Sequence, residues 1–297
     1  MSKSLNQVKI ESPRVISADR ETIKRTEPAM STKSDKTIAT TRKGIFREYF
    51  ESFVVTLIMA FFGMTFIVQA VTVPTGSMQN TIMIGDHLLV NKFIFAPGPP
   101  LPFLPMREIK RGDIIVFKYP GNQFNPAQDR GTTSVPYQTN FVKRVMGLPG
   151  DTIEFRDDQV FINGELLPEY RMVGFEPRPD AALETSEIQQ RKPNDLPYTV
   201  YYDKKKLEKT LKGEHLPTDE YNFGVAGTKT KIPADSYFVI GDNRDNSYDS
   251  RFWGFIPRSL IIGRAMFVYW SCDKSYGDSA LQCLTHPRLN RIGKLIK

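Results

Sequence analysis

Three short segments contain residues whose types and spacing could carry out chemistry. In Pro74-Thr75-Gly76-Ser77-Met78, a glycine beside a serine allows a tight turn that exposes the hydroxyl, although a lone serine usually has a structural role. In the apolar run 141–151, Lys143 is either an edge-strand lysine that extends to water or a buried lysine whose lowered pKa makes it a neutral base. The segment 241–251 is dense in Gly, Asn, Asp and Arg, which indicates either a polar loop or a buried charge network.

Histidine and cysteine are scarce, since the chain of 297 residues has only three His and two Cys. Zinc fingers and ribbons need four nitrogen or sulfur ligands at short fixed spacings, so they are excluded, and at most one disulfide can form. A histidine base would have to be His87, His215 or His286. We expect His87 to be an ordinary strand residue and the other two to be loop residues without a catalytic role.

A long uncharged segment precedes Ser77 and extends from Ser52 to Gly85. Its apolar centre, 53–71, would span roughly 28 Å as a helix, close to the hydrocarbon thickness of a bilayer. This centre is apolar on every side, which favours a membrane span over a buried helix of a soluble domain or a cleaved signal peptide. We predict a transmembrane helix over 52–73, ended by Pro74.

The basic charge of the chain is concentrated in its N-terminal segment. Residues 1–44 carry ten Lys and Arg against five Asp and Glu, which is +5 of the net charge of +7. This segment has no apolar periodicity and no basic motif interleaved with aromatic residues, so a nucleic-acid partner is not expected. We predict a disordered basic tail over 1–51, which the positive-inside rule places in the cytoplasm, because Arg42, Lys43 and Arg47 lie just before the span.

The remaining sequence predicts a mainly β fold outside the cytoplasm, which we expect to consist of coiled antiparallel sheets. The main β domain is expected to comprise 74–164 and 236–297, whereas the more polar residues 165–235 are expected to form an inserted, irregular β subdomain. The strands Thr152–Arg156 and Gln159–Asn163 flank Asp157-Asp158 and are predicted to form a hairpin. The other predicted elements are strands at Asp113–Tyr119, Ser236–Ile240 and Ala265–Trp270 and a short helix at Asp203–Lys212.

Four ordered blocks resemble the type I signal peptidases (bacterial leader peptidases), a family of membrane-bound endopeptidases with a Ser/Lys dyad. The blocks are Pro74–Met78, Gly85–Lys92, Lys143–Asp151 and Gly241–Pro257, and Arg288–Gly293 resembles Gram-negative members. Thr75 stands where the family often has Ser, and Asn80 where it often has Pro.

The resemblance implies a role for each residue of the motifs. Ser77 would be the nucleophile, Lys143 its general base, and Ser247 would hold the lysine amine by a hydroxyl hydrogen bond. The oxyanion hole would consist of the Ser77 N–H and the Thr75 hydroxyl. A structural ion network around the site would comprise Asp242, Arg244, Asp249 and Arg251.

The implied substrate is an exported preprotein, cleaved after a small-x-small pattern such as A-x-A without a metal or other cofactor. The extended peptide would add by strand pairing, and five apolar residues would form either its pockets or plain core: Pro74, Met78, Ile82, Phe141 and Val142. Other expected partners are the lipid bilayer and the protein export machinery. The implied location is the bacterial inner membrane, crossed once, with the N-terminus cytoplasmic and the catalytic domain periplasmic.

Two questions stay open at this point. Cys272 and Cys283 could form a disulfide in an oxidising periplasm or remain two buried thiols. The chain could also be a specialised Ser/Lys peptidase that matures one exported, conjugation or phage protein, or an inactive membrane-anchored binding protein.

Overall fold

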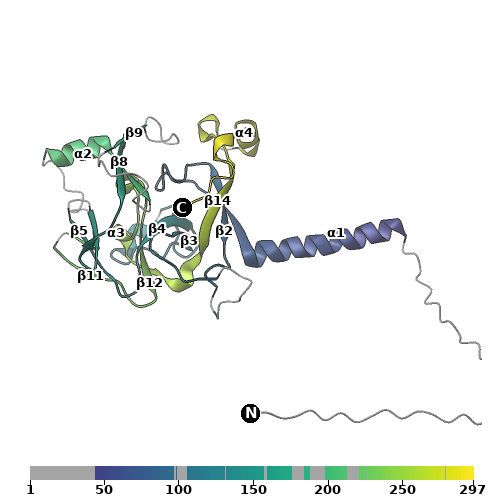
Figure 1. Cartoon of the computed structure of the whole chain (residues 1–297), viewed down its shortest axis with the longest axis horizontal. Helices are drawn as coiled ribbons and strands as arrows, with labels where there is room; N and C mark the ends of the chain where they lie inside the picture. The colour runs from purple at the N-terminus through teal and green to yellow at the C-terminus, as the bar shows by residue number, and fades with distance from the viewer. Residues whose placement is uncertain are drawn as a thin grey trace, which may run out of the picture. The chain divides into compact units, whose positions relative to one another are not determined.

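The structure is a computed structural model, and it describes residues 44–96, 98, 106–130, 132–156, 159–175, 184–187, 198–212, 221–225, 227–277 and 279–297. The predicted tail up to residue 43, the turn Asp157-Asp158 and His215 lie outside these residues. The chain divides into two units, Met1–Tyr49 and Phe50–Lys297. In the first unit, the described residues are Gly44 and the beginning of helix α1; the second contains all the strands that the structure describes (Figure 1).

The apolar segment forms α1 (Ile45–Phe62), which continues as the π-helical η1 (Gly63–Ile67). This helix of 23 residues is long and apolar enough to cross a membrane, and none of its residues is buried in the protein. The predicted boundaries 52–73 are wrong at both ends. Val68–Thr72 form strand β1 instead, because Val71 packs with Val90 and Val116 once β1 pairs with its neighbour.

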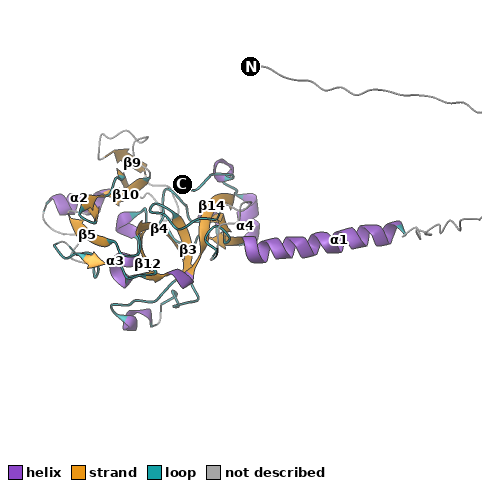
Figure 2. Cartoon of the chain, turned by 60° about the horizontal axis from the view of Figure 1, so that its bottom comes forward, coloured by secondary structure: helices purple, strands orange, loops and turns teal. Residues whose placement is uncertain are grey.

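Lys143 belongs to a curled seven-stranded sheet whose strand pairs are all antiparallel, and Ser77 lies in the turn after its first strand (Figure 2). Its spatial order is β1-β2-β14-β3-β4-β12-β13. After β1, the strands are β2 (Asp86–Asn91), β3 (Ile114–Lys118), β4 (Asn140–Gly147), β12 (Ser236–Ile240), β13 (Ile256–Pro257) and β14 (Ile261–Ser271). The predicted strands Asp113–Tyr119, Ser236–Ile240 and Ala265–Trp270 are therefore confirmed in place.

A smaller sheet changes the predicted domain boundary. It has the order β11-β5-β6-β7 and joins the predicted hairpin to two strands of the proposed insertion. The hairpin strands β5 (Thr152–Arg156) and β6 (Gln159–Ile162) are antiparallel, as predicted. Since β7 (Glu165–Leu166) and β11 (Thr230–Lys231) complete their sheet, a boundary at residue 165 would divide a hydrogen-bonded unit.

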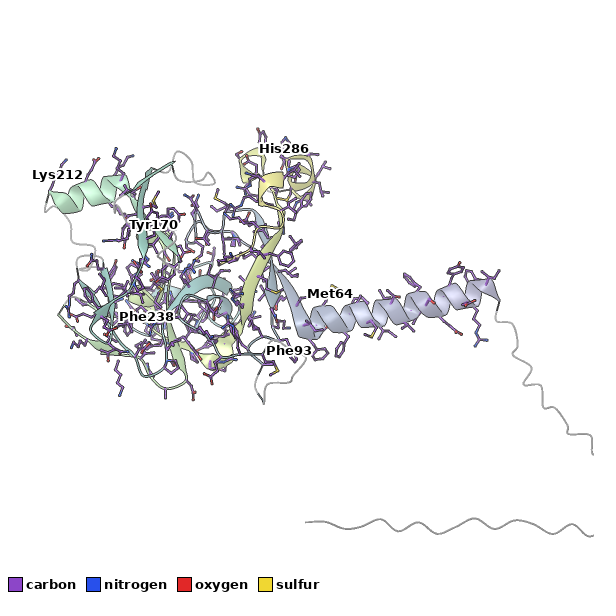
Figure 3. The ribbon with its side chains drawn as sticks, in the orientation of Figure 1. Met64, Phe93, Tyr170, Lys212, Phe238 and His286 are labelled. Carbon is purple, nitrogen blue, oxygen red and sulfur yellow. A yellow bond between two sulfur atoms is a disulfide. The ribbon has the colours of Figure 1, made fainter. Side chains whose placement is uncertain are left out.

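The third sheet, β10-β8-β9, lies within the proposed insertion. Strands β8 (Tyr170–Phe175) and β10 (Thr199–Asp203) are parallel, an exception to the antiparallel expectation, and β9 (Glu184–Glu187) is antiparallel to β8. Helix α2 (Lys204–Leu211) follows β10 and confirms the helix predicted there; Figure 3 shows Lys212 just beyond its end. The other short helices are α3 (Ser250–Trp253) and α4 (Ala280–Thr285).

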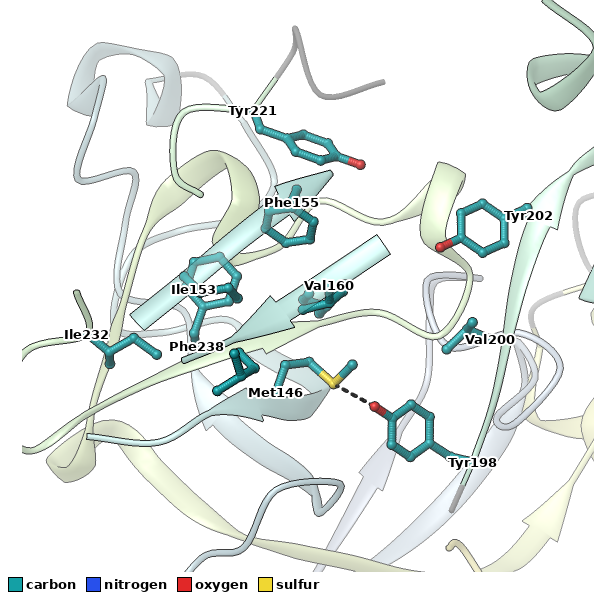
Figure 4. Close-up of a cluster of buried hydrophobic side chains, with 12 residues drawn as sticks. Met146, Ile153, Phe155, Val160, Tyr198, Val200, Tyr202, Tyr221, Ile232 and Phe238 are labelled. Atoms are coloured by element: carbon teal, nitrogen blue, oxygen red, sulfur yellow. Dashed lines mark hydrogen bonds between the residues drawn. The ribbon is translucent and has the colours of Figure 1, made fainter. Parts of the chain in front are cut away.

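The largest buried cluster joins these sheets (Figure 4). Met146 of β4 and Phe238 of β12 pack there with Phe155 of β5 and Val200 of β10. The Tyr198 hydroxyl also donates to Sδ of Met146 at 3.6 Å. The inserted strands consequently share a core with the strands that carry the site.

Candidate active site

Ser77 lies in the turn that follows β1, and its side chain is buried, with 8% of the residue exposed. Gln79 N–H donates to the Gly76 carbonyl at 3.0 Å, which closes the turn. A side chain at Gly76 would meet Gln79 Oε1, so the Gln79 side chain would have to move to accommodate it. The Ser77 N–H donates no hydrogen bond to another described residue.

Lys143 is the residue that the fold brings to Ser77. It lies in β4, it is 4% exposed, and its Nζ donates a hydrogen bond to Ser77 Oγ. Burial lowers the pKa of Lys143 from 10.5 to about 8. The nearby charges largely oppose one another, because Asp249 raises this pKa and Arg251 lowers it. A large fraction of the Lys143 amine is therefore neutral at moderately alkaline pH.

An aromatic wall accounts for much of the apolar surroundings of the amine. The Phe141 ring centroid lies 5.5 Å from Lys143 Nζ, because residues two apart in a strand point to the same face. The Tyr119 ring stacks on Phe141 with centroids 4.8 Å apart, and Trp253 packs edge-on against Tyr119 at 5.8 Å. These rings exclude water from one side of the amine.

Ser77 and Lys143 line a cavity of about 640 Å³. Four of the five predicted pocket residues line it as well: Pro74, Met78, Phe141 and Val142. Ile82 does not line the cavity, because it is fully buried in the core cluster that contains Met78 and Leu88. The predicted oxyanion residue Thr75 is exposed at the cavity.

Ser247 also lines the cavity, and it is 7% exposed. Its Oγ has no hydrogen-bond partner within the described part of the chain, so the predicted bond to the Lys143 amine is not formed in this structure. A side chain at Gly241 would overlap both Ser247 Oγ and the Ser77 carbonyl. A glycine is therefore needed for these two segments to approach each other.

The predicted ion network exists, but two of its partners were missed from the sequence. Arg251 pairs with Asp249 as neighbours in one segment, Nε to Oδ1 at 2.8 Å. Asp242, by contrast, accepts two hydrogen bonds from Arg144, at 2.8 and 2.7 Å, and Arg244 pairs with a glutamate of the insertion, Glu169. All these side chains are buried.

The electrostatics of the pair next to the site follow from this geometry. Burial alone would raise the pKa of Asp249, but Arg251 holds it below its usual range. Asp249 is therefore ionised together with Arg251 and anchors the backbone, since its Oδ2 accepts from Gly241 N–H at 3.0 Å. Arg144 could have been recognised from its position beside Lys143 in the sequence. Glu169 could not, because it is 75 residues from Arg244, its partner.

His87 is half-buried, and its ring nitrogens contact Thr72 and Cys283 instead of Ser77. Its Nδ1 lies 3.2 Å from Thr72 Oγ1, and its Nε2 lies 3.7 Å from Cys283 Sγ. Burial lowers the pKa of His87, and the positive charge of Lys274 lowers it further. Cys272 and Cys283 are joined by a disulfide. The three residues form a cluster of potential metal ligands within 4.8 Å, but the two sulfurs are bonded to each other and are not available as thiolates.

The chain is similar to known proteins over most of its length. Residues 46–270 match the family described as signal peptidase, peptidase S26. Signal peptidase I of Pseudomonas aeruginosa is 33% identical over 264 residues, which cover 83% of this chain and 78% of that protein. The chain belongs to the signal peptidase family. Signal peptidase I of Aquifex aeolicus is 31% identical over 280 residues, with 84% of this chain and 97% of that protein covered.

Membership of the signal peptidase family confirms the resemblance stated from the motifs. The chain is a serine endopeptidase of this family, and its mainly β body agrees with the predicted fold class. Its apolar N-terminal helix fits a membrane-anchored signal peptidase.

Proposed function

We propose that Ser77 and Lys143 cleave signal peptides from exported preproteins. The observation that carries this proposal is the buried hydrogen bond between Lys143 Nζ and Ser77 Oγ at the wall of the cavity. In the reactive state, the neutral amine accepts the hydroxyl proton while Oγ attacks the scissile carbonyl. The C–N bond then breaks, the amine returns the proton to the leaving nitrogen, and water hydrolyses the acyl-enzyme by the same route.

The oxyanion would be stabilised by two donors beside the nucleophile. The Ser77 N–H has no other described acceptor, and the Thr75 hydroxyl is exposed at the same cavity. Two donors aimed at the oxyanion act before the reaction begins and need no reorganisation. The unpartnered hydroxyl of Ser247 would orient the Lys143 amine when substrate is bound.

The substrate would bind as an added strand along β4. Residues 140–144 of β4 pair with β3, whereas its pairing with β12 covers only the part from Arg144 to Gly147. The stretch 140–143 therefore has β3 as its one partner strand among the described residues, because the pairing with β12 ends at Ile240 opposite Arg144. An extended peptide can use this free edge, with alternate side chains entering the apolar cavity. Signal peptidases act on preproteins with a signal peptide, and a small-x-small sequence such as A-x-A suits a pocket walled by Met78, Phe141 and Val142.

The location follows from the charges that flank the span. Arg42 and Lys43 precede the apolar helix and Arg47 lies in its first turn, so the N-terminus would be cytoplasmic and the catalytic body periplasmic in a bacterial inner membrane crossed once. The basic segment before the helix, residues 1–44, would be the cytoplasmic tail. The bilayer and the export machinery would then deliver the substrate to the same membrane surface.

One assay tests this function. The purified full chain in detergent is incubated with a preprotein that carries an A-x-A signal peptide. We expect cleavage by the wild type, loss of cleavage in Ser77→Ala and Lys143→Ala, and retention in the control His87→Ala, whose ring nitrogens contact Thr72 and Cys283 instead of Ser77.

The alternatives give different results. A peptidase specialised for one exported, conjugation or phage protein would leave the generic preprotein intact, and an inactive binding protein would bind it without cleavage. Loss of cleavage in His87→Ala together with full activity in Lys143→Ala would overturn the Ser/Lys assignment.

A further inference from the structure

The segment after β12 holds the backbone of the nucleophile in place. Asn243, 3% exposed, donates from its N–H to the Ser77 carbonyl at 3.1 Å and from Nδ2 to the Gly76 carbonyl at 3.2 Å. These bonds fix the two peptide groups on either side of the Ser77 Cα, and the first of them in the chain contains the Ser77 N–H. Displacement of Asn243 would therefore move the nucleophile and the proposed oxyanion donor together.

The inserted strand β10 supports the opposite side of this segment. Tyr201 N–H donates to the Asp242 carbonyl at 2.8 Å, and Tyr201 forms a parallel bridge with Asn243. Two residues further along β10, Asp203 N–H donates to Asp245 Oδ2 at 2.7 Å. Strand β10 is thus hydrogen-bonded to the segment that holds Ser77, although it belongs to the region 165–235.

A buried ion pair anchors the same segment to the insertion. Arg244 donates from Nη1 and Nη2 to the two carboxylate oxygens of Glu169, at 2.9 and 2.5 Å. Arg244 is 3% exposed and Glu169 6% exposed, so neither charge has water as an alternative partner. Loss of one partner would leave the other charge buried and uncompensated, which is strongly unfavourable.

Packing makes this support stiff. The side chains of Tyr198, Val200 and Tyr202 lie in the same buried cluster as Met146 of β4 and Phe238 of β12 (Figure 4). The backbone of Arg244 is also held within the segment 241–251, because Arg251 Nη2 donates to the Arg244 carbonyl at 2.7 Å. A displacement of Glu169 would therefore shift the residues packed around it, because a close-packed core leaves little space for local relaxation.

We infer that Glu169 is a positioning residue of the proposed peptidase reaction: it holds Arg244, and through the adjoining Asn243 it fixes the Ser77 turn. The inserted region is consequently part of the catalytic architecture and not a separate appendage. This inference rests on the proposed function of Ser77 and Lys143.

The test compares Glu169→Gln with a matched control in the full chain. Glu154 is also 6% exposed and accepts two hydrogen bonds from one arginine, Arg156, but it lies on β5 and its bonds do not reach the segment 242–251. We expect Glu169→Gln to lower kcat at least tenfold with KM changed less than about twofold, because a small misplacement of a nucleophile has a large effect on rate. Glu154→Gln should keep the wild-type kcat.

Two further variants separate positioning from general stability. Glu169→Asp keeps a carboxylate for Arg244, so its kcat should lie between those of wild type and Glu169→Gln; it also serves if Glu169→Gln does not fold. In the double variant Glu169→Gln/Asn243→Ala, the combined loss of kcat should fall well short of the product of the two single losses, because both act on one turn.

The inference is overturned if Glu169→Gln and Glu154→Gln have the same kcat, if Glu169→Asp is no different from wild type, or if the losses in the double variant multiply fully. Ser77→Ala distinguishes this from failure of the proposed function. If Ser77→Ala cleaves like wild type, the function itself is wrong, whereas an inactive Ser77→Ala with a fully active Glu169→Gln contradicts only the role of Glu169.

Discussion

Lys143 Nζ donates a hydrogen bond to Ser77 Oγ across 66 residues of sequence, and both side chains are buried. The contact exists because the turn after β1 and the strand β4 meet at one wall of the cavity. Burial of the amine has two measurable consequences, one for the rate of cleavage and one for stability.

The first prediction concerns the pH dependence of cleavage. Only neutral Lys143 can accept the Ser77 proton, and burial sets its pKa to about 8. We expect kcat/KM to rise about tenfold per pH unit below this value and to level off above it. Measurements between pH 6 and 10 on wild type and His87→Ala should give the same curve; a midpoint at or below 6.5 that disappears in His87→Ala would contradict the lysine base.

The second prediction concerns stability. Between pH 8 and 10.5, the unfolded chain binds a proton at Lys143 that the folded chain does not, so folding stability contributed by this residue rises with pH in that window. At pH 7, the burial of the charged amine opposes folding by roughly 3 kcal/mol. Lys143→Met should therefore be inactive but more stable than wild type at pH 7, with the difference shrinking toward pH 10. Denaturant unfolding at several pH values measures this, and a variant less stable at every pH would argue against it.

A third prediction concerns the oxyanion. Thr75→Val keeps the shape of an exposed side chain but removes its hydroxyl. We expect kcat to fall by about 10²–10³ with little change in unfolding temperature. Thr75→Ser is the control and should retain most activity, because it keeps the donor; equal rates for the two variants would exclude the hydroxyl from the oxyanion hole.

The fourth prediction concerns the disulfide between Cys272 and Cys283, which are 11 residues apart. Denatured protein should take up no maleimide before reduction and two equivalents after it. Because the bridge closes a short loop, Cys272→Ser/Cys283→Ser should lower the free energy of unfolding by about 3 kcal/mol at most. Neither cysteine lines the cavity, so kcat should be unchanged; labelling before reduction would show that the bridge is absent.

The motifs were sufficient to predict the family and the site residues to be tested, and the apolar patterns predicted five of the strands, β3, β5, β6, β12 and β14. Ser77, Lys143 and the segment 241–251 each have residue types that suit one reaction, and alternation located β5, β6 and β12 to within a residue. These features are local, so composition and spacing carry them. The same is true of the apolar helix, whose existence follows from its composition.

Only the tertiary structure decided where the helix ends and what each charge binds. Val68–Thr72 form a strand because they pair with β2. Ile82 lies in the core and not at the cavity, because it packs in the same buried cluster as Met78. The ion pairs Arg144–Asp242 and Glu169–Arg244 form between segments that are far apart in the sequence and meet only in the folded chain. The sequence by itself determined which groups were present, but burial, which sets the pKa of Lys143, is a property of the assembled fold, because water is excluded only when distant segments pack together.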